Sequence, residues 1–451
     1  MESRGSYLRT LGIVSAADPL FSGASGDAVL QAFFDYLAEH GGVGFIPPGD
    51  YVCTDTVTVS GDGITVFGAG GWKTTISRGA GMTGKPILAL VNCRECSFDG
   101  LGVVAGGGDV CSAGIEIRGD TGGISTSNVF KNLYVRSTAV PSTMTNNIHF
   151  AIGSAGDQNN DLCSLYSCVL SNPVNANVKI EGSQSREHNF HSCRLFSGVY
   201  GIESDGYSMS WHGGNVAEHA VADFYFTRPQ QVTTITNISS EQSKRFLSTS
   251  GASGGDGYIS VTGLRFSADL LHDDGEAIIY QHRGAFTLRG SNIGARTDES
   301  LCKIRIEPHG SKGCAFITEG NAWGGAGSLA ASPYILGLSK GDKISIADQY
   351  ISSSEVVDTA TALGDGDATP SIFSSSFFTT ANTTETTITA FDDAWIGKET
   401  LIEIGDDNTI VDLSSEHFVA DSSVSLDTSS GDVVRVIWDG ERHHVTIVRS
   451  G

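Results

Sequence analysis

Three carboxylates near the middle of the chain have the residue type and spacing for general acid–base chemistry. Glu181 and Glu203 each follow an isoleucine in similar phrases 22 residues apart, and Asp205 comes two residues later. If both isoleucines point inward on successive strands, the carboxylates point outward on backbones about 4.8 Å apart. Glycosidases use two such groups, one with a raised pKa as general acid and one as nucleophile or water-activating base. We predict these three as the catalytic residues; ordinary solvated surface charge is the alternative.

Five further polar residues are predicted to bind substrate beside them. His191, His212 and Glu218 fall on the intervening turns or on the next strand, where they would line the same groove. Asp157 and Asp161 belong to an acidic loop in the longest insertion between repeats, and insertions of this kind shape binding grooves. This loop lacks the glycine and the terminal glutamate of a calcium loop. We therefore predict no metal site and no cofactor.

The element that must position these residues is a repeated strand. One apolar phrase recurs eight times along the chain at intervals of 21 to 35 residues, which is the spacing of coils in a solenoid. A second phrase alternates apolar and polar residues between these anchors, as at Ile148-His-Phe150 and Val178-Lys-Ile180, and it predicts a second sheet. The eight anchors, predicted to be interior, are Val66, Phe98, Phe130, Leu165, Phe190, Trp211, Ile235 and Val261.

A single amphipathic helix precedes the repeats. Asp27 is its predicted N-cap, the helix is expected over about 27–40, and Gly41-Gly42 ends it. The next strand closes in the phrase Pro47-Pro48-Gly49-Asp50-Tyr51. One helix followed only by short strands resembles the opening of the pectate-lyase-like right-handed parallel β-helix family, and phage tail-spike and depolymerase proteins are the branch that it resembles most.

The resemblance implies an all-β fold, a right-handed parallel β-helix solenoid with an N-terminal capping helix. We expect an N-terminal tail over 1–19, the solenoid over 20–345, a linker or loose coils over 346–376, and a small β-sandwich-like module over 377–451. The ending Gly431-Asp-Val-Val-Arg-Val-Ile-Trp438 is similar to modules that close tail-spike chains and often trimerise them. The ordered catalytic sets of the pectate lyase and polygalacturonase branches are missing.

Composition narrows the classes of partner. The 451 residues carry a net charge of −23, with 28 Lys and Arg against 51 Asp and Glu, so clustered cations for nucleic acid or anionic membrane are not expected. No apolar run approaches the roughly 20 residues of a membrane span, and the first residues lack the pattern of a signal peptide. Nine cysteines without zinc-like spacing favour reduced, buried thiols.

The resemblance and these exclusions predict a homotrimeric phage tail-spike or fibre protein that recognises bacterial surface polysaccharide. It would be made in the host cytoplasm and carried on the virion, attached to a tail or baseplate protein through its N-terminal tail. Whether it also hydrolyses the polysaccharide is left open. The alternatives are a free extracellular hydrolase or lyase acting on polysaccharide, and an adhesive shaft without catalysis.

Overall fold

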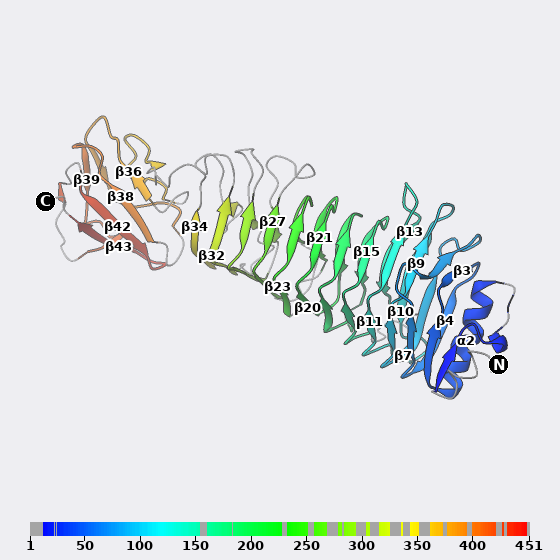
Figure 1. The fold of residues 1–451 in the computed structure, drawn as a ribbon. Helices are drawn as coiled ribbons and strands as arrows, with labels where there is room; N and C mark the ends of the chain where they lie inside the picture. The colour runs from blue at the N-terminus through cyan, green and yellow to red at the C-terminus, as the bar shows by residue number, and fades with distance from the viewer. Residues whose placement is uncertain are drawn as a thin grey trace.

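The structure is a computed structural model that describes most of the chain. It describes residues 12–21, 23, 25–153, 160–182, 184–227, 232–250, 257–267, 278–281, 284–294, 304–306, 315–324, 335–336, 343–350, 361–372, 377–394, 399–420, 426–427 and 431–448. Figure 1 shows a long stack of coils with one helix at its N-terminal end and a separate group of strands at its C-terminal end. The chain is a right-handed parallel β-helix.

Each coil of the solenoid contributes strands to three parallel sheets. Sheet 1 contains β4 (Val57–Asp62), β7 (Leu88–Arg94), β10 (Cys111–Arg118), β13 (Met144–Phe150), β16 (Ala176–Ile180), β19 (Tyr200–Ser204), β22 (Ala222–Phe226), β25 (Leu247–Thr249), β28 (Ile279–Gln281), β31 (Ile304–Ile306) and β33 (Ile335–Leu336).

Sheet 2 contains β1 (Ile13–Ser15), β2 (Val43–Ile46), β5 (Thr65–Gly68), β8 (Ser97–Asp99), β11 (Val129–Lys131), β14 (Ser164–Tyr166), β17 (His188–His191), β20 (Ser208–His212), β23 (Val232–Thr236), β26 (Tyr258–Thr262), β29 (Ala285–Arg289), β32 (Ala315–Gly324) and β34 (Lys343–Tyr350). Sheet 3 contains β3 (Gly49–Cys53), β6 (Thr74–Arg78), β9 (Gly102–Ala105), β12 (Tyr134–Ser137), β15 (Val169–Ser171), β18 (Arg194–Phe196), β21 (Asn215–Ala217), β24 (Ser239–Glu241), β27 (Arg265–Ser267) and β30 (Asn292–Gly294), and β32 joins it to sheet 2.

The predicted anchors form one interior stack under sheet 2. Phe98 pairs with Phe130, Phe190 pairs with Trp211, and the other anchors pair in the same order along the solenoid. All eight are at most 1% exposed, so the prediction that they are interior is confirmed. The rings stack as well, with 5.8 Å between the centroids of Phe98 and Phe130.

The bend between sheets 2 and 3 explains why the phrase repeats. In successive coils one residue at this bend has φ between 50° and 69°, the left-handed region that glycine and asparagine tolerate best. Gly100 and Asn132 are examples, and each donates its backbone N–H to a carbonyl oxygen of the following coil, at 3.0 and 2.9 Å. The sharp bend returns the next residue, such as Leu101 or Leu133, to the interior.

The capping helix covers the first coil. Helix α2 (Gly26–His40) buries Leu30, Phe33, Phe34 and Leu37 against the end of the interior stack. Its N-cap is Ser25, two residues before the predicted N-cap Asp27, so that detail of the prediction is wrong. Asp27 lies inside the first turn, and its carboxylate accepts the backbone N–H of Thr54 at 2.8 Å.

The C-terminal strands form two smaller sheets around a separate hydrophobic core. The six-stranded sheet has the order β35 (Thr361–Ala362), β36 (Phe377–Thr379), β38 (Glu399–Glu403), β42 (Val433–Trp438), β43 (His443–Val448), β40 (Phe418–Val419), and the other contains β37 (Thr386–Ile388), β39 (Thr409–Val411) and β41 (Leu426–Asp427). Strands β42 and β43 form the antiparallel hairpin expected at Asp439-Gly440.

Strand pairing bears on the ends of the solenoid. Strand β1 pairs with β2 although it lies within the stretch expected to be a tail, and β34 still pairs with β32 beyond residue 345. Strand β35 lies within the expected linker and pairs with β36. The domain boundaries given from the sequence remain predictions.

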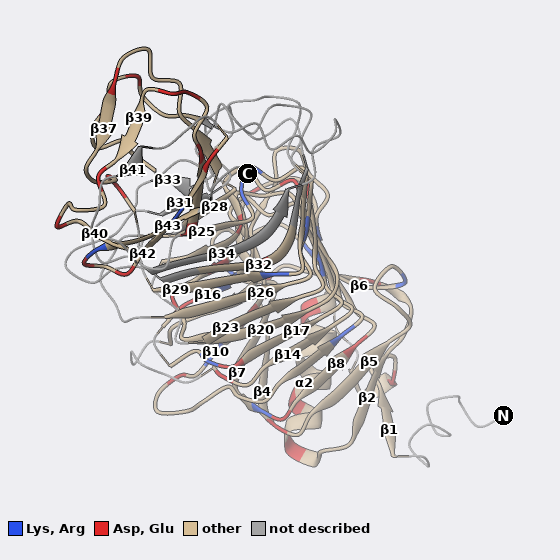
Figure 2. Cartoon of the chain, turned by 90° about the vertical axis from the view of Figure 1, so that its left-hand side faces the viewer, with Lys and Arg blue, Asp and Glu red and all other residues tan. Residues whose placement is uncertain are grey.

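Figure 2 shows acidic positions in both the solenoid and the C-terminal unit.

We expect Phe130→Ala to destabilise the solenoid by about 3–5 kcal/mol, because a fully buried ring at the centre of the stack is lost and the neighbouring rings cannot close the cavity. Urea denaturation followed by tryptophan fluorescence measures the loss. Lys131→Ala, at the adjacent exposed position, is the matched control and should change stability by less than about 0.5 kcal/mol. Equal effects of the two substitutions would contradict the stacked core.

Candidate functional site

A row of titratable side chains runs along the outer side of sheet 1. The strand register places Glu116 beside His149, His149 beside Lys179, Lys179 beside Glu203, and Glu203 beside Tyr225. Inward neighbours such as Val178 and Ile202 are fully buried, whereas the row itself is partly exposed. Alternation along the strand therefore separates the apolar interior from a polar outer row.

The predicted register between β16 and β19 is wrong by two residues. Ile202 pairs with Val178 rather than with Ile180, and Ser204 takes the place beside Ile180. Glu203 therefore lies beside Lys179 and not beside Glu181. Ser204 is 1% exposed and pairs on its other side with the large ring of Phe226, so a small side chain occupies this interior position. A cation and a carboxylate are thus paired where two stacked carboxylates were expected.

Glu181 sits directly after β16 and contacts two basic side chains. Its Oε1 lies 2.8 Å from Lys179 Nζ, and its Oε2 lies 3.0 Å from His149 Nε2 on the preceding coil. All three side chains are between 15% and 29% exposed, which weakens solvent screening of these contacts. His149 and then Lys179 outweigh the opposing effect of burial and lower the pKa of Glu181 to about 2.

Lys179 is the centre of the three predicted catalytic carboxylates. Burial opposes its charge, but Glu181 at hydrogen-bond distance and the more distant charges of Glu203 and Asp205 outweigh burial and raise its pKa. The structure thus brings Glu181, Glu203 and Asp205 together around one cation. Sequence reasoning missed Lys179 and His149 as site residues, although both occupy the outward position of the second repeated phrase.

Glu203 has different surroundings from Glu181. Its Oε2 accepts a hydrogen bond of 2.6 Å from the neutral amide of Asn175. The stacked rings of Tyr200 and Tyr225 lie nearby, with centroids 4.7 Å apart. Burial, then Tyr225 and Glu203, raises the pKa of Tyr200.

Asp205 follows β19 and faces the coil before it. Its Oδ1 accepts the backbone N–H of Gly182 at 2.5 Å, and its own N–H donates to the carbonyl oxygen of Ile180 at 3.0 Å. This places Asp205 next to Glu181 along the stack of coils. Asp205, and not Glu203, is therefore the acidic residue that occupies the position next to Glu181 on the following coil.

The two predicted substrate-binding histidines lie together, but on a different sheet. His191 and His212 project from the outer side of sheet 2, with ring centroids 5.0 Å apart, and Tyr166 stacks on His191 at 4.7 Å. His212 Nδ1 lies 2.9 Å from Thr236 Oγ1. Their strands belong to sheet 2, so they form a ring ladder apart from the carboxylates on sheet 1.

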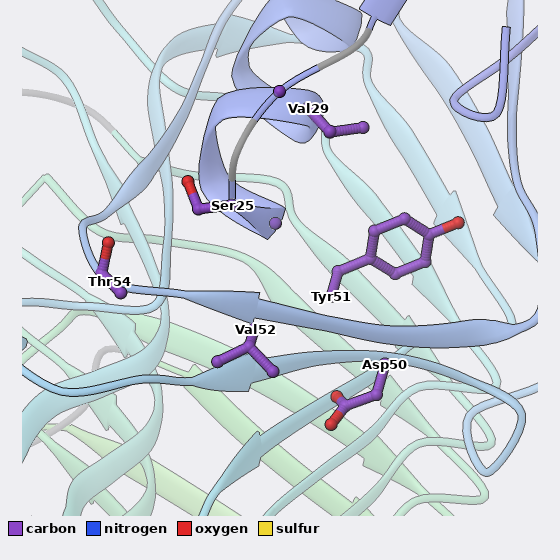
Figure 3. Close-up of a pocket in the computed structure, with 8 residues that line it drawn as sticks. Ser25, Val29, Asp50, Tyr51, Val52 and Thr54 are labelled. Carbon is purple, nitrogen blue, oxygen red and sulfur yellow. The ribbon is translucent and has the colours of Figure 1, made fainter.

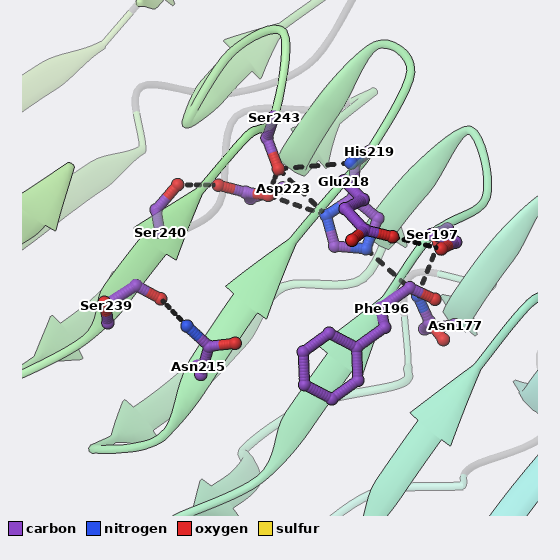
Figure 4. Close-up of polar contacts among 10 residues, drawn as sticks. All are labelled: Asn177, Phe196, Ser197, Asn215, Glu218, His219, Asp223, Ser239, Ser240 and Ser243. Atoms are coloured by element: carbon purple, nitrogen blue, oxygen red, sulfur yellow. Dashed lines mark hydrogen bonds and ion pairs between the residues drawn. The ribbon is translucent and has the colours of Figure 1, made fainter. Parts of the chain in front are cut away.

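Glu218 and Asp161 also lie away from the carboxylates, and Asp157 lies outside the described residues. Glu218 follows β21 and accepts a hydrogen bond of 2.9 Å from Ser197 Oγ (Figure 4). Asp161 precedes β14, and Thr126 of the preceding coil donates a hydrogen bond to its carboxylate. The residues proposed from the sequence thus occupy several surfaces instead of one groove.

A buried polar network lies beneath Glu218. Asp223 is fully buried, and its Oδ1 lies 2.6 Å from His219 Nδ1 while Ser240 and Ser243 donate hydrogen bonds to its carboxylate. His219 Nε2 lies 3.0 Å from Asn177 Nδ2 (Figure 4). Because these side chains are shielded from solvent and satisfy one another, we interpret the network as part of the core.

A pocket of about 460 Å³ opens beside the start of α2. It is lined by residues that include Ser25, Asp50, Tyr51 and Thr54 (Figure 3). Its lining residues do not overlap the charged row on sheet 1. Among the described residues, no group of three or more His, Cys, Asp or Glu side chains is arranged to hold a metal ion. None of the described helices has the length and apolarity to cross a membrane.

The low pKa of Glu181 predicts that its ion pairs stabilise the fold in a pH-dependent way. Ionised Glu181 stabilises the fold fully above about pH 4.5, the ordinary range of a glutamate, and this stability is lost as the pH falls toward 2. We therefore expect the melting temperature of Glu181→Gln to lie below that of the wild type at pH 5 and to approach it at about pH 2.5. Glu39→Gln, at a largely exposed position on α2, serves as control. A difference that is unchanged between the two pH values would refute the ion pairing.

Comparisons with known proteins identify the fold. No family model and no curated protein matches the sequence. Among solved structures, the chain is similar to the gp42 tailspike of Acinetobacter phage vb_AbaP_AS12, with a TM-score of 0.53 and 11% identity over 96% of this chain and 76% of that one. It is also similar to DFA-IIIase from Arthrobacter chlorophenolicus A6, with a TM-score of 0.49 and 12% identity over 74% of this chain and 94% of the enzyme.

A third similar structure is the A-module of the mannuronan C-5 epimerase AlgE6 from Azotobacter vinelandii, with a TM-score of 0.47 and 12% identity over 76% of this chain and 99% of the module. At such identities the likeness concerns the fold. Together with the three parallel sheets, the match to the tailspike shows that this chain is a right-handed parallel β-helix protein of the fold that phage tailspikes use.

Proposed function

We propose that the chain is a tailspike-type protein that binds bacterial surface polysaccharide along the outer side of sheet 1 and hydrolyses it there. The observation that carries the proposal is the meeting of three carboxylates with unlike surroundings around Lys179, on a partly exposed face. The likeness to a phage tailspike over 96% of the chain supports the biological setting, because it extends through the C-terminal unit as well as the solenoid.

The surroundings of the carboxylates assign their roles. Glu181 stays ionised at any physiological pH because His149 and Lys179 hold its pKa low, so it is unsuited to donate a proton. It fits the carboxylate that faces the positive charge of the transition state, as nucleophile or as base for water. Glu203 accepts a hydrogen bond from the neutral amide of Asn175 and fits the general acid. Asp205 fixes the backbone at Gly182.

Elimination is a second candidate, favoured by the basic and phenolic groups of the same row. A polysaccharide lyase removes the proton next to a uronate carboxylate and needs a cation to stabilise the resulting charge. Lys179 and His149 are such cations or bases, and Tyr200 and Tyr225 are proton carriers beside Glu203. The two chemistries differ in their products, because only elimination leaves an unsaturated sugar.

The proposed tailspike-type function also implies an assembly and a location for the protein. We infer a homotrimer carried on the virion, attached through the N-terminal tail, with the C-terminal unit contributing to trimer contacts. A free extracellular enzyme and an adhesive shaft without catalysis are the competing readings. Light scattering on the purified chain distinguishes a trimer from a monomer, and a monomeric mass at micromolar concentration would contradict the assembly.

We expect the purified protein to shorten at least one member of a panel of capsular, O-antigen and exopolysaccharide preparations, with new reducing ends. Glu181→Gln and Glu203→Gln should each lower the cleavage rate at least about a hundredfold, the usual contribution of general acid–base groups. Glu187 is exposed and directly precedes β17 of sheet 2. The matched control Glu187→Gln should therefore keep the full rate.

The products decide between the candidates. New reducing ends without ultraviolet absorbance of an unsaturated sugar support hydrolysis, and the appearance of that absorbance supports elimination. Binding without cleavage across the panel, or cleavage that both glutamine variants retain, would contradict a catalytic site on sheet 1 and would favour the adhesive shaft.

A further inference from the structure

Trp72 is the most exposed large aromatic side chain among the described residues. It is 67% exposed, whereas Trp211 is fully buried in the interior stack. Exposing an indole to water costs free energy that burial would recover, so a tryptophan fixed at the surface is a candidate contact for a ligand. It lies far along the chain from the carboxylates of sheet 1, in the turn that joins β5 and β6.

The backbone holds Trp72 in place over a later coil. Gly71 lies so close to β12 that a Cβ added to it would come within 2.7 Å of Tyr134 Cβ. The intervening coil offers Gly102 at the paired position, and a Cβ there would collide with the carbonyl oxygen of Gly71. Because Gly71 and Gly102 have no side chains, the turn that carries Trp72 can pass over the coil of β9. Trp72 therefore reaches Tyr134 on the coil of β12.

Trp72 stacks on one side only. Its ring centroid lies 4.1 Å from that of Tyr134, and the guanidinium carbon of Arg136 lies 4.3 Å from the Trp72 centroid and 4.8 Å from the Tyr134 centroid. If the indole were sandwiched between them, Tyr134 and Arg136 would be separated by nearly the sum of the first two distances. They are much closer, so both lie to the same side of the indole, and its other face is the exposed one.

Arg136 supplies a positive charge on the covered side of the indole, next to Tyr134. Its Nη1 donates to the hydroxyl oxygen of Tyr134 at 3.3 Å, and its Nε is buried without a hydrogen-bond partner. Among the described residues no carboxylate lies within ion-pair distance of it, in a chain with 51 acidic and 28 basic residues. The aromatic rings fix the guanidinium, whose planar fork matches an anionic group of a ligand.

From this arrangement we propose that Trp72, Tyr134 and Arg136 form a binding site on sheet 3 for a sugar residue that carries an anionic substituent. The apolar C–H face of a pyranose ring packs on the free face of the indole, and the carboxylate, sulfate or phosphate of the same sugar extends past the edge of the indole to the guanidinium on its other side. The site binds without bond making, and it lies on a sheet other than that of the carboxylates. It adds a glycan contact outside the proposed catalytic row.

The test measures retention of polysaccharides in affinity electrophoresis. The panel holds acidic polysaccharides, with uronate, sialic acid, sulfate or phosphate groups, and neutral polysaccharides of similar size. All variants are made in a Glu181→Gln/Glu203→Gln background, so that cleavage on sheet 1 does not affect the reading. Trp72→Ala and Arg136→Gln test the site, and Trp72→Phe and Arg136→Lys are the conservative versions. Tyr258→Ala, which removes another exposed ring, and Arg435→Gln, which removes an exposed arginine, are controls.

We expect at least one acidic polysaccharide to be retained, and Trp72→Ala and Arg136→Gln each to weaken its retention at least about tenfold, as loss of an anchoring Trp or Arg does. Trp72→Phe and Arg136→Lys should recover part of the retention, and the controls should keep all of it. The proposal is overturned if no acidic polysaccharide is retained, or if retention is unchanged in Trp72→Ala.

A change of assembly would also overturn it. If Trp72→Ala alters the mass of the protein in light scattering, the exposed indole is a contact between copies of this chain and not a glycan site. Failure of cleavage on sheet 1 leaves these readings intact, because the background variant already lacks both carboxylates. The two proposals can therefore fail separately.

Discussion

The parallel register between successive coils is the constraint on which the rest of the structure depends. A strand's side chains alternate between interior and surface, so a register fixes both what stacks in the core and what meets on the outer side. Phe98, Phe130, Phe190 and Trp211 follow one another inside because of it, and the left-handed residue at each bend keeps the coils in step. The same register sets Lys179 beside Glu203 outside.

The three outer surfaces show how one architecture separates different chemistry. Sheet 1 presents a row of acidic and basic side chains, sheet 2 presents the stacked rings of Tyr166, His191 and His212, and sheet 3 presents the indole of Trp72. Packing inside the solenoid is similar beneath all of them. Outward positions can carry many different polar side chains without changing the packed interior. A few outward residues therefore set the function, and the fold alone does not determine the function.

The sequence allowed most of the solenoid to be predicted and only part of the site. Anchors such as Phe130 are large, apolar and followed by a turn residue, so their stack could be read correctly. The register error at β19 arose because an alternating phrase looks the same after a shift of two residues. Two residues after Ile202 comes the buried Ser204, which lies beside Phe226. A small residue fits there because of its volume, and the alternating pattern does not reveal this. Contacts across coils, such as that of His149 with Glu181, depend on this register and were missed for the same reason.

Cysteine cross-linking measures the register itself. Paired residues on neighbouring parallel strands have Cα atoms about 4.8 Å apart, inside the range of about 4.4–6.8 Å that a disulfide spans. A Lys179→Cys/Glu203→Cys variant should therefore form an intramolecular disulfide under mild oxidation, identified by peptide mass spectrometry. Glu181→Cys/Glu203→Cys, offset by two residues along the strand, should not. A disulfide in the second variant and none in the first would contradict the register, and with it the arrangement of the carboxylates around Lys179.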